Sequence, residues 1–368
     1  MYLQGLQLQD FRNYRAQELI FAAPKTILVG DNAQGKSNLL EAVELLATLT
    51  SHRAGRDREL VLGEQPQASI LATVERWGVR RQLGMTLRAS GRRTLHIDGQ
   101  TLSRQLDFLG HLNAVLFSSW DLELVRGSPE QRRHWLDGVL LQLEPLFGHI
   151  REDYGRVLRQ RNALLKADTW DPQVLAVWNE SLIKSGIRVM RRRQRLLTRL
   201  LPLARVWHQH ISGGQEGLDL VYQPQVPVGD PENLTEWVAH FQEQLQQLAG
   251  AERQRGTSLV GPHRDEVLLT INGIPARIYG SQGQQRTLVL ALKLAELQLI
   301  EDVIGEPPLL LLDDVLAELD IHRQNHLLEA IQDRIQTIVT ATHISSFAAP
   351  WVTSAQIVHV HQGSLLIP

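Results

Sequence analysis

The chain lacks cysteine and has no apolar run long enough to cross a membrane. None of its 368 residues is Cys, which excludes disulfides, thiol catalysis and thiolate-bound metals. A spanning helix needs about 20 consecutive apolar residues, and no segment of the chain approaches that. The first residues also lack the basic and apolar regions of a signal peptide. We therefore expect a cytoplasmic protein with no membrane partner.

An excess of positive charge is also missing, and lysine is scarce. The 38 basic residues, nearly all arginine, are balanced by 40 acidic ones, giving a net charge of −2. Any nucleic-acid binding must therefore come from local patches. Arginine's planar guanidinium suits phosphate recognition, although genome composition favours arginine as well. The length leaves room for roughly two domains.

Residues 30–37, Gly-Asp-Asn-Ala-Gln-Gly-Lys-Ser, match the pattern G-x-x-x-x-G-K-S/T. An apolar strand over residues 25–29 precedes this P-loop, and apolar residues at helical spacing follow it, which is the context the motif requires. Backbone N–H groups and the helix dipole would bind phosphates, Lys36 would reach the β- and γ-phosphates, and Ser37 would ligate Mg²⁺. The expected ATP-binding residues are Gly30, Asp31, Asn32, Ala33, Gln34, Gly35, Lys36, Ser37 and Asn38.

A second apolar strand, residues 309–312, ends in the two carboxylates Asp313 and Asp314. P-loop nucleotidases hold Mg²⁺ with an acidic residue from such a strand. We expect Asp313 on the metal and Asp314 placed to polarise the attacking water.

A long helical stretch separates these two motifs. Ser128 as N-cap, Pro129 and Gln131 predict a capping-box start, and helical patterns continue to about Ala204 and again from Leu234 to Ala249. No heptad repeat is sustained, so a compact arm is expected rather than a long coiled coil. The predicted fold class is α/β, with a head over residues 1–122 and 256–368 and a mainly helical arm over residues 123–255.

Strand patterns are expected on both sides of the arm. Residues 2–8 are typical of an edge strand, and residues 68–97 of antiparallel strands followed by an Asp98-Gly99 turn. Beyond the arm, residues 267–271 and 276–278 are expected to pair across an Asn272-Gly273 turn.

Residues 281–285, Ser-Gln-Gly-Gln-Gln, stand at a predicted helix N-terminus, where an anion is favoured. They resemble the S-G-G-Q signature of ABC-type ATPases, with Gln282 in place of the first glycine. In that class Ser281 and Gly283, with Gln284, would close on the γ-phosphate held by a second copy, which implies an ATP-dependent head-to-head dimer. The resemblance also gives His343 the place of the switch histidine that contacts the γ-phosphate.

Two positions depart from that class. The acid after the metal aspartate is usually glutamate, and the shorter Asp314 implies slow turnover, with ATP acting as a timer for the dimer. The class also uses a glutamine near the strand before the insertion. Residues 116–121 contain none, which leaves a serine or Asp121 as the alternatives.

Taken together the chain resembles, from end to end, the RecF family of bacterial DNA replication and repair ATPases, relatives of the SMC heads. The resemblance rests on these motifs and on short segments in order, namely residues 10–14, 51–53, 56–60, 127–133, 261–265, 281–286 and 311–320. Departures are Ser119-Trp120, where the family usually has Pro-Glu, and Glu266, where a second aspartate is usual.

The resemblance implies ATP-dependent binding of single-stranded and gapped duplex DNA. It implies RecO and RecR as partners, with RecA loading and SOS induction downstream. Arg12 and Asn13 would lie beside the nucleotide, and Asp320 would belong to the loop crossing the dimer seam.

DNA contacts are expected from arginines. Arg188, Arg192, Arg195 and Arg199 fall at i, i+4, i+7 and i+11 of a predicted helix, and such a stripe could follow a phosphate backbone. The alternatives are a solvated or protein-paired face, and the loop containing Arg53 and Arg56 competes for the DNA role. No base-reading module is visible, so recognition of shape and backbone is expected.

Two other function classes remain as alternatives. A transporter ATPase subunit is disfavoured by the long insertion between the P-loop and the signature. A P-loop kinase or GTPase is disfavoured by residues 281–285 and by the absence of an N-K-x-D guanine motif.

Overall fold

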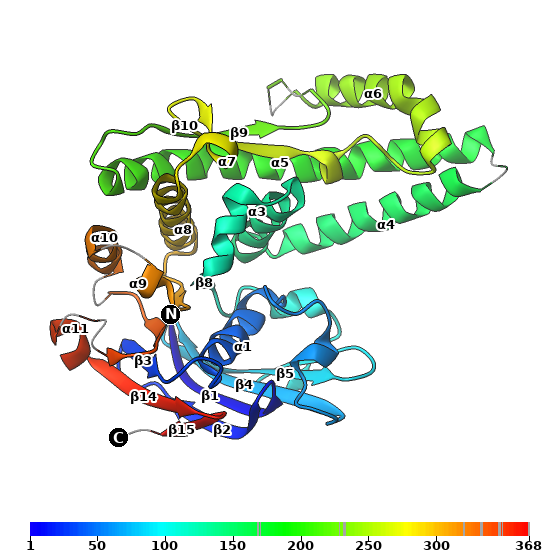
Figure 1. Cartoon of the computed structure of the whole chain (residues 1–368). Helices are drawn as coiled ribbons and strands as arrows, with labels where there is room; N and C mark the ends of the chain where they lie inside the picture. Colours follow the sequence, from blue (N-terminus) through cyan, green and yellow to red (C-terminus); the bar gives the residue numbers. More distant parts are fainter. Residues whose placement is uncertain are drawn as a thin grey trace. The chain divides into compact units, whose positions relative to one another are not determined.

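The computed structural model describes residues 1–167, 169, 171–227, 229–230, 233–318, 321–331, 334–344, 347 and 349–366. Contacts divide the chain into two compact units. The first consists of Met1–Asp121 and Leu290–Pro368, and the second of Leu122–Val289. Each unit is built around its own elements (Figure 1).

The first unit contains a largely parallel sheet in the order β15-β14-β3-β13-β12-β8. The strands are β3 (Lys25–Val29), β8 (Ala114–Phe117), β12 (Leu309–Leu312), β13 (Thr337–Ala341), β14 (Ala355–His361) and β15 (Ser364–Leu366). Every residue of β3, β12 and β13 is buried, as expected for parallel strands that are covered on both faces. The two apolar runs predicted as strands from the sequence are therefore neighbours of the same central strand, β13.

An antiparallel sheet completes the first unit, in the order β2-β1-β4-β5-β6-β7. Its strands are β1 (Tyr2–Phe11), β2 (Tyr14–Ile20), β4 (Gln67–Arg76), β5 (Val79–Arg88), β6 (Thr94–Ile97) and β7 (Gln100–Thr101). The Asp98-Gly99 turn is confirmed between β6 and β7. The edge position predicted for residues 2–8 is wrong, because β1 pairs with β2 on one side and β4 on the other.

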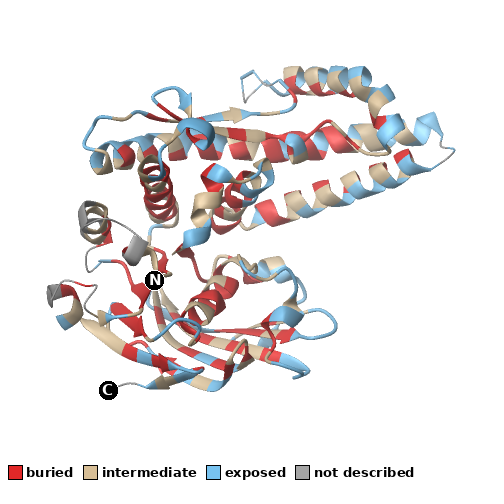
Figure 2. Ribbon diagram, viewed as in Figure 1, coloured by how far each residue is buried: buried red, intermediate tan, exposed pale blue. Residues whose placement is uncertain are grey.

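Helix α1 (Lys36–Thr48) shares one hydrophobic core with both sheets. Its Leu39, Val43 and Leu46 are buried with Leu6 of β1 and Leu311 of β12, and buried positions line the facing surfaces in Figure 2. The other helices of this unit are the part of α8 (Gln282–Ile304) from Leu290 onward, α9 (Val315–Glu318), α10 (Ile321–Ile331) and α11 (Ala349–Thr353). Burial of α1 along most of its length holds the P-loop that precedes it in a fixed place.

The second unit is mainly helical. It contains α2 (Glu123–Arg126), α3 (Pro129–Leu143), α4 (Leu146–Lys166), α5 (Pro172–Ile211), α6 (Leu234–Arg255), α7 (Ala276–Tyr279) and the start of α8, together with β9 (Leu218–Gln223), β10 (Glu266–Ile271) and β11 (Ile274–Pro275). The predicted capping box is confirmed, with Ser128 and Gln131 bonded reciprocally at the start of α3.

Two details of this unit differ from the sequence-based expectations. Residues 276–278 are helical rather than extended, because β11 pairs with β10 over only two residues before α7 begins. Residues 256–289, which were assigned to the head, belong to the second unit because β10 pairs along its whole length with β9. The contacts also separate the units after Asp121 rather than after Leu122.

Candidate nucleotide site

The P-loop joins β3 to α1 in a conformation that requires its two glycines. A Cβ on Gly30 would lie 2.3 Å from the carbonyl oxygen of Val360 in the neighbouring strand β14. Gly35 has a φ of 120° and a Cβ there would lie 2.6 Å from the Asn13 side chain. Both positions exclude a side chain, since backbone approaches this closely and positive φ favours glycine. The loop is thus shaped by β14 on one side and by the β1–β2 turn on the other.

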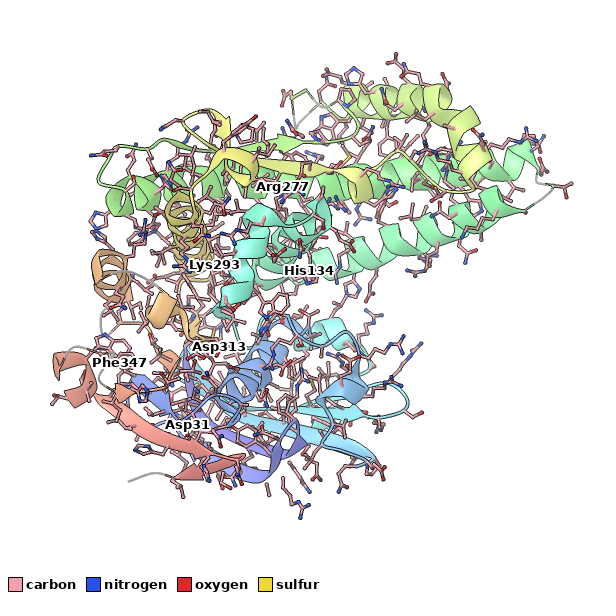
Figure 3. All side chains as sticks on the ribbon, viewed as in Figure 1. Asp31, His134, Arg277, Lys293, Asp313 and Phe347 are labelled. Atoms are coloured by element: carbon pink, nitrogen blue, oxygen red, sulfur yellow. The ribbon has the colours of Figure 1, made fainter. Side chains whose placement is uncertain are left out.

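Lys36 lies inside this loop with 4% of its surface exposed. Its ammonium donates to the carbonyl oxygens of Gly30 at 2.7 Å and Asp31 at 2.9 Å. The positive charge is therefore held against the loop backbone, where the sequence places the phosphates. Asp31 of the loop and Asp313 after β12 are both marked in Figure 3.

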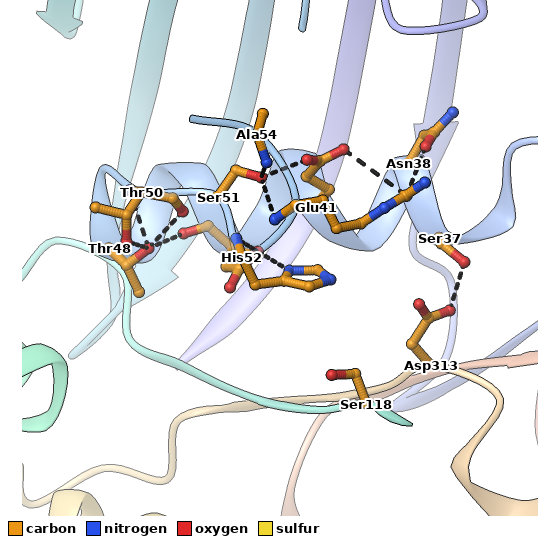
Figure 4. Close-up of polar contacts among 12 residues, drawn as sticks. Ser37, Asn38, Glu41, Thr48, Thr50, Ser51, His52, Ala54, Ser118 and Asp313 are labelled. Atoms are coloured by element: carbon orange, nitrogen blue, oxygen red, sulfur yellow. Dashed lines mark hydrogen bonds and ion pairs between the residues drawn. The ribbon is translucent and has the colours of Figure 1, made fainter. Parts of the chain in front are cut away.

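The two predicted metal ligands are in direct contact. The Ser37 hydroxyl donates to Asp313 Oδ1 at 2.7 Å (Figure 4). Hydroxyl and carboxylate oxygens are ligands that suit Mg²⁺, which usually takes only one or two carboxylates from the protein and the rest from phosphates and water. In keeping with this, the described part of the chain contains no group of three or more acidic, His or Cys side chains fit for a metal. Ser37 and Asp313 therefore fit a nucleotide-bound Mg²⁺ rather than an all-protein metal cage.

Thr340 of β13 contacts both Asp313 and Asp314 and was missed by the sequence analysis. Its hydroxyl donates to Asp313 Oδ1 at 3.0 Å and accepts the Asp314 backbone N–H at 2.8 Å. Asp314 has a φ of 54°, a left-handed conformation that non-glycine residues rarely adopt without a structural reason. Thr340 thus fixes both carboxylate-bearing residues, and these contacts cross between the paired strands β12 and β13, which no local sequence pattern shows.

A hydrogen-bond chain ties two sequence segments, residues 10–14 and 51–53, to the P-loop. Asn13 donates to the Gln34 carbonyl at 2.8 Å and accepts from Asn38 at 2.8 Å, and Asn38 accepts from Arg53 at 2.9 Å. Asn13 therefore lies beside the P-loop, and Arg53 reaches the residue that follows Ser37. Arg56 is exposed in the same segment.

Glu41 of α1, which is fully buried, anchors this chain. It accepts two hydrogen bonds from Arg12, at 2.8 and 2.6 Å, and one from Ser51, and Arg53 lies 4.0 Å away (Figure 4). Arg12 also donates to the Glu59 carbonyl, so its guanidinium is engaged by the protein itself. Nothing in the sequence pattern singles out Glu41, because it occupies an ordinary position of an amphipathic helix.

The segment after β8 carries the alternatives for the missing glutamine. Asp121 accepts the Ser118 backbone N–H at 2.6 Å and lies 3.7 Å from the Lys293 ammonium of α8, which is 3.1 Å from Glu296. Burial raises the pKa of Asp121 despite the opposing effect of Lys293. Burial lowers the pKa of Lys293, but Glu296 and Asp121 outweigh it and the net shift is upward. The Asp121 carboxylate is thus engaged by Ser118 and Lys293.

The predicted signature begins α8 in the second unit. Gln284 accepts the Ser281 backbone N–H at 2.8 Å, while the Ser281 hydroxyl accepts the Gln284 N–H at 3.2 Å, so the two form a capping box. Gln284 also donates to Glu216 at 2.9 Å. Ser281 is exposed and Gly283 half-buried.

In the first unit His343 is exposed just beyond β13, and Asp320 lies outside the described residues.

The predicted arginine stripe lies along α5 in the second unit. Arg188, Arg195 and Arg199 are exposed, whereas Arg192 forms an ion pair with Glu144 at 3.1 Å. Arg188 also lines a groove of about 780 Å³. Its other basic side chains come from α4, namely His149, Arg151, Arg156 and Arg159, and Glu152 and Asp153 line it as well. The sequence analysis missed the α4 arginines because they are spread among acidic residues.

Residues 261–265 have a structural role that the sequence did not reveal. His263 Nδ1 accepts from the Tyr154 hydroxyl at 2.6 Å and Nε2 donates to the Ser258 carbonyl at 3.0 Å. This neutral tautomer agrees with the pKa of His263, which burial lowers to about 4. Arg193 donates to Asp137 at 2.8 and 3.0 Å and to the Pro262 carbonyl at 2.6 Å. The motif therefore ties α3, α4 and α5 together.

Comparisons with known proteins agree with these features. The family model of the RecF/RecN/SMC N terminal domain matches residues 2–364. The DNA replication and repair protein RecF of Synechococcus sp. (strain JA-2-3B'a(2-13)) is 64% identical, over 99% of this chain and 97% of that protein.

Solved structures extend the comparison. A structure of the recombination mediator protein RecF-ATP in the RecFOR pathway superimposes with a TM-score of 0.93 at 29% identity, covering 100% of this chain and 97% of that one. The Smc head domain from Pyrococcus furiosus matches with a TM-score of 0.56 at 15% identity, covering 100% and 96%, which is a likeness of fold. No helix among the described residues is both long and apolar enough to span a bilayer.

Proposed function

This chain belongs to the RecF family of DNA replication and repair proteins, with an ABC/SMC-type ATPase fold, and we propose that it is an ATP-driven DNA-binding switch. In this proposal the protein binds ATP and Mg²⁺, dimerises, engages single-stranded and gapped duplex DNA, and hydrolyses ATP slowly. The observation that carries it is the contact between Ser37 of the P-loop and Asp313, which follows β12 and is fixed by Thr340.

The P-loop residues would bind the phosphates of ATP. Backbone N–H groups at the start of α1 point to an anion site, and Lys36 already lies within the loop. Ser37 and Asp313 would hold Mg²⁺, which neutralises charge on the phosphates. Asp314 would orient the attacking water. Its carboxylate is one methylene shorter than glutamate, which favours slow turnover.

A second copy of the chain would complete the site. Ser281, Gly283 and Gln284 stand at the N-terminus of a 23-residue helix, where the dipole favours a phosphate. The proposed arrangement places them on the γ-phosphate bound by the partner subunit's P-loop, with His343 as the switch histidine.

DNA would be bound through its backbone. The exposed Arg188, Arg195 and Arg199 of α5 and the α4 arginines of the groove supply positive charge without a base-reading element. Binding through phosphates alone predicts strong salt dependence.

By family membership we propose RecO and RecR as partners, RecA loading and SOS induction as the downstream outcome, and the cytoplasm as the location.

Sedimentation with ATP·Mg²⁺ tests the proposal. We expect wild type to dimerise and Lys36→Met and Ser281→Arg to stay monomeric, with gapped DNA increasing the dimer of wild type alone. Gln246→Arg, an equally drastic change at an exposed position of α6, is the matched control and is expected to dimerise. Normal dimerisation of Ser281→Arg would refute the composite site.

A further inference from the structure

The turn after α1 holds His52 in a defined orientation. Ser51 accepts the backbone N–H groups of Arg53 and Ala54, at 2.9 and 2.8 Å, and donates to the buried Glu41. His52 Nδ1 lies 2.6 Å from Glu44 Oε2 of α1. Because a carboxylate only accepts, Nδ1 carries the proton of this bond and the opposite nitrogen, Nε2, is turned away from α1.

Nε2 is the anomaly of this region. It is buried and has no hydrogen-bond partner among the described residues. A buried polar atom without a partner is costly and calls for an explanation. The imidazole lies on the same side of α1 as Ser118 and Asp313, as Figure 4 shows. Asp313 is near enough to act on its charge, since Glu44, Glu41 and Asp313 together overcome the effect of burial and raise the pKa of His52.

Among the neighbouring groups, Asp121 does not offer Nε2 a partner, because it is engaged by Ser118 and Lys293. Mg²⁺ bound to a nucleotide usually retains several waters. The oxygen of such a water is held by the cation, so the water donates its hydrogens, and the acceptor it finds here is Nε2 of the neutral imidazole.

We propose that His52 is a further residue of the nucleotide site, whose Nε2 hydrogen-bonds a water of the bound Mg²⁺·ATP while Glu44 fixes the ring. The inference rests on the proposed function, because it requires that the P-loop bind ATP with Mg²⁺. The turn after α1, together with the segment after β8, would then supply polar groups to the site where the glutamine of the ABC class is missing.

NMR of the full-length chain labelled with ¹⁵N-histidine tests the contact directly. The His52 signals are assigned with His52→Gln, and ATPγS is added first with EDTA and then with Mg²⁺. We expect the Nε2 resonance to move when Mg²⁺ and ATPγS are both present and to stay unchanged with ATPγS and EDTA. A resonance that never moves, or that moves equally without Mg²⁺, overturns the inference.

Affinity measurements supply the second test. The gain in ATPγS affinity on adding Mg²⁺ should fall about fivefold in His52→Leu, the loss of one water-mediated hydrogen bond, and recover in His52→Gln. Glu44→Gln should lower it less. His96→Leu is the matched control, because His96 is also half-buried in the first unit with Nδ1 bonded to a neighbour, Thr101.

The two levels of the proposal fail in different ways. If wild type itself binds no ATPγS with Mg²⁺, the proposed function falls and the inference falls with it. If wild type binds and a folded His52→Leu retains the full Mg²⁺-dependent gain, only the role of His52 is refuted.

Discussion

The P-loop region and the motif at residues 261–265 both concentrate buried polar side chains, yet they use them differently. Around residues 261–265, Arg193 donates to Asp137 and to the Pro262 carbonyl. His263 uses both ring nitrogens, one on the Tyr154 hydroxyl and one on the Ser258 carbonyl. Around the P-loop, Lys36 donates to two carbonyl oxygens, and a phosphate can take their place as acceptors. His52 Nε2 has no hydrogen-bond partner among the described residues.

This difference distinguishes a polar motif that stabilises the fold from one that binds a ligand. A closed network stabilises the packing of helices, so its loss should unfold the unit that contains it. A network that leaves a polar atom without a partner, or holds a cation against carbonyl groups that a ligand can replace, is arranged to bind a ligand. Its loss should therefore change ligand binding and leave the fold intact.

Arg193→Met should destabilise the second unit most. Removing one partner of a buried pair leaves an uncompensated charge, here Asp137, and typically costs about 3–5 kcal/mol. Urea unfolding followed by a probe in the second unit measures the change, and Arg199→Met, at an exposed position of the same helix, should stay within about 0.5 kcal/mol. Equal losses in both variants would show that the buried network has no special weight.

Asp314→Asn should reduce ATP hydrolysis while leaving the fold intact. A general base typically contributes about 10²–10⁴-fold to a rate, so we expect a loss of at least about a hundredfold in single-turnover assays. ATP binding and the urea midpoint should be unchanged. A rate equal to that of wild type would remove Asp314 from the reaction.

Acid should destabilise the second unit through His263. Its pKa of about 4 lies below the ordinary value of 6.5, so the unfolded chain binds a proton before the folded chain does. The stability this group contributes is complete above about pH 6.5 and is lost progressively as the pH falls toward 4, up to about 3 kcal/mol. Urea midpoints of wild type should fall over that range, and His263→Phe should show a shallower fall. Identical slopes would contradict the assignment.

Thr340→Val should have the smallest effect. It removes the hydroxyl that joins Asp313 to the Asp314 backbone and keeps the shape of a buried strand residue. We expect a loss of about fivefold in Mg²⁺-dependent ATP affinity, the worth of about one hydrogen bond, by calorimetric titration. Thr337→Val, in the same strand but with a hydroxyl that donates to the Ile335 carbonyl, is the control and should bind normally.

The parts of the candidate site that could be predicted from the sequence are those marked by a pattern within one short segment. Residues 30–37 and Asp313 each combine a short motif with the strand or helix beside it, and such patterns are visible in one segment. Glu41, His52 and Thr340 could not be found this way, because their partners come from segments far apart in the chain and their residue types are common at such positions.

The fold was predictable within similar limits. Apolar runs and the capping box at Ser128 located the buried strands and α3, and the α/β class followed from them. The pairing of β9 with β10 bridges residues 218–271 across helix α6, so periodicity within either segment could not assign β10 to the arm. The same holds for β1, whose internal position depends on a partner more than sixty residues away, at Gln67–Arg76.

The strands that flank β3 have a consequence for protein synthesis. β3 is paired on one side with β13 and on the other with β14, and the Gln362 and Gly363 N–H groups donate to Gln34 of the P-loop at 2.7 and 2.9 Å. Both neighbours follow β3 in the chain by about 300 residues or more, and a ribosome adds about 5–20 residues per second. The nascent P-loop therefore waits tens of seconds for the strands that pair with β3. Nucleotide binding by a nascent chain should thus begin only after β14 has been synthesised.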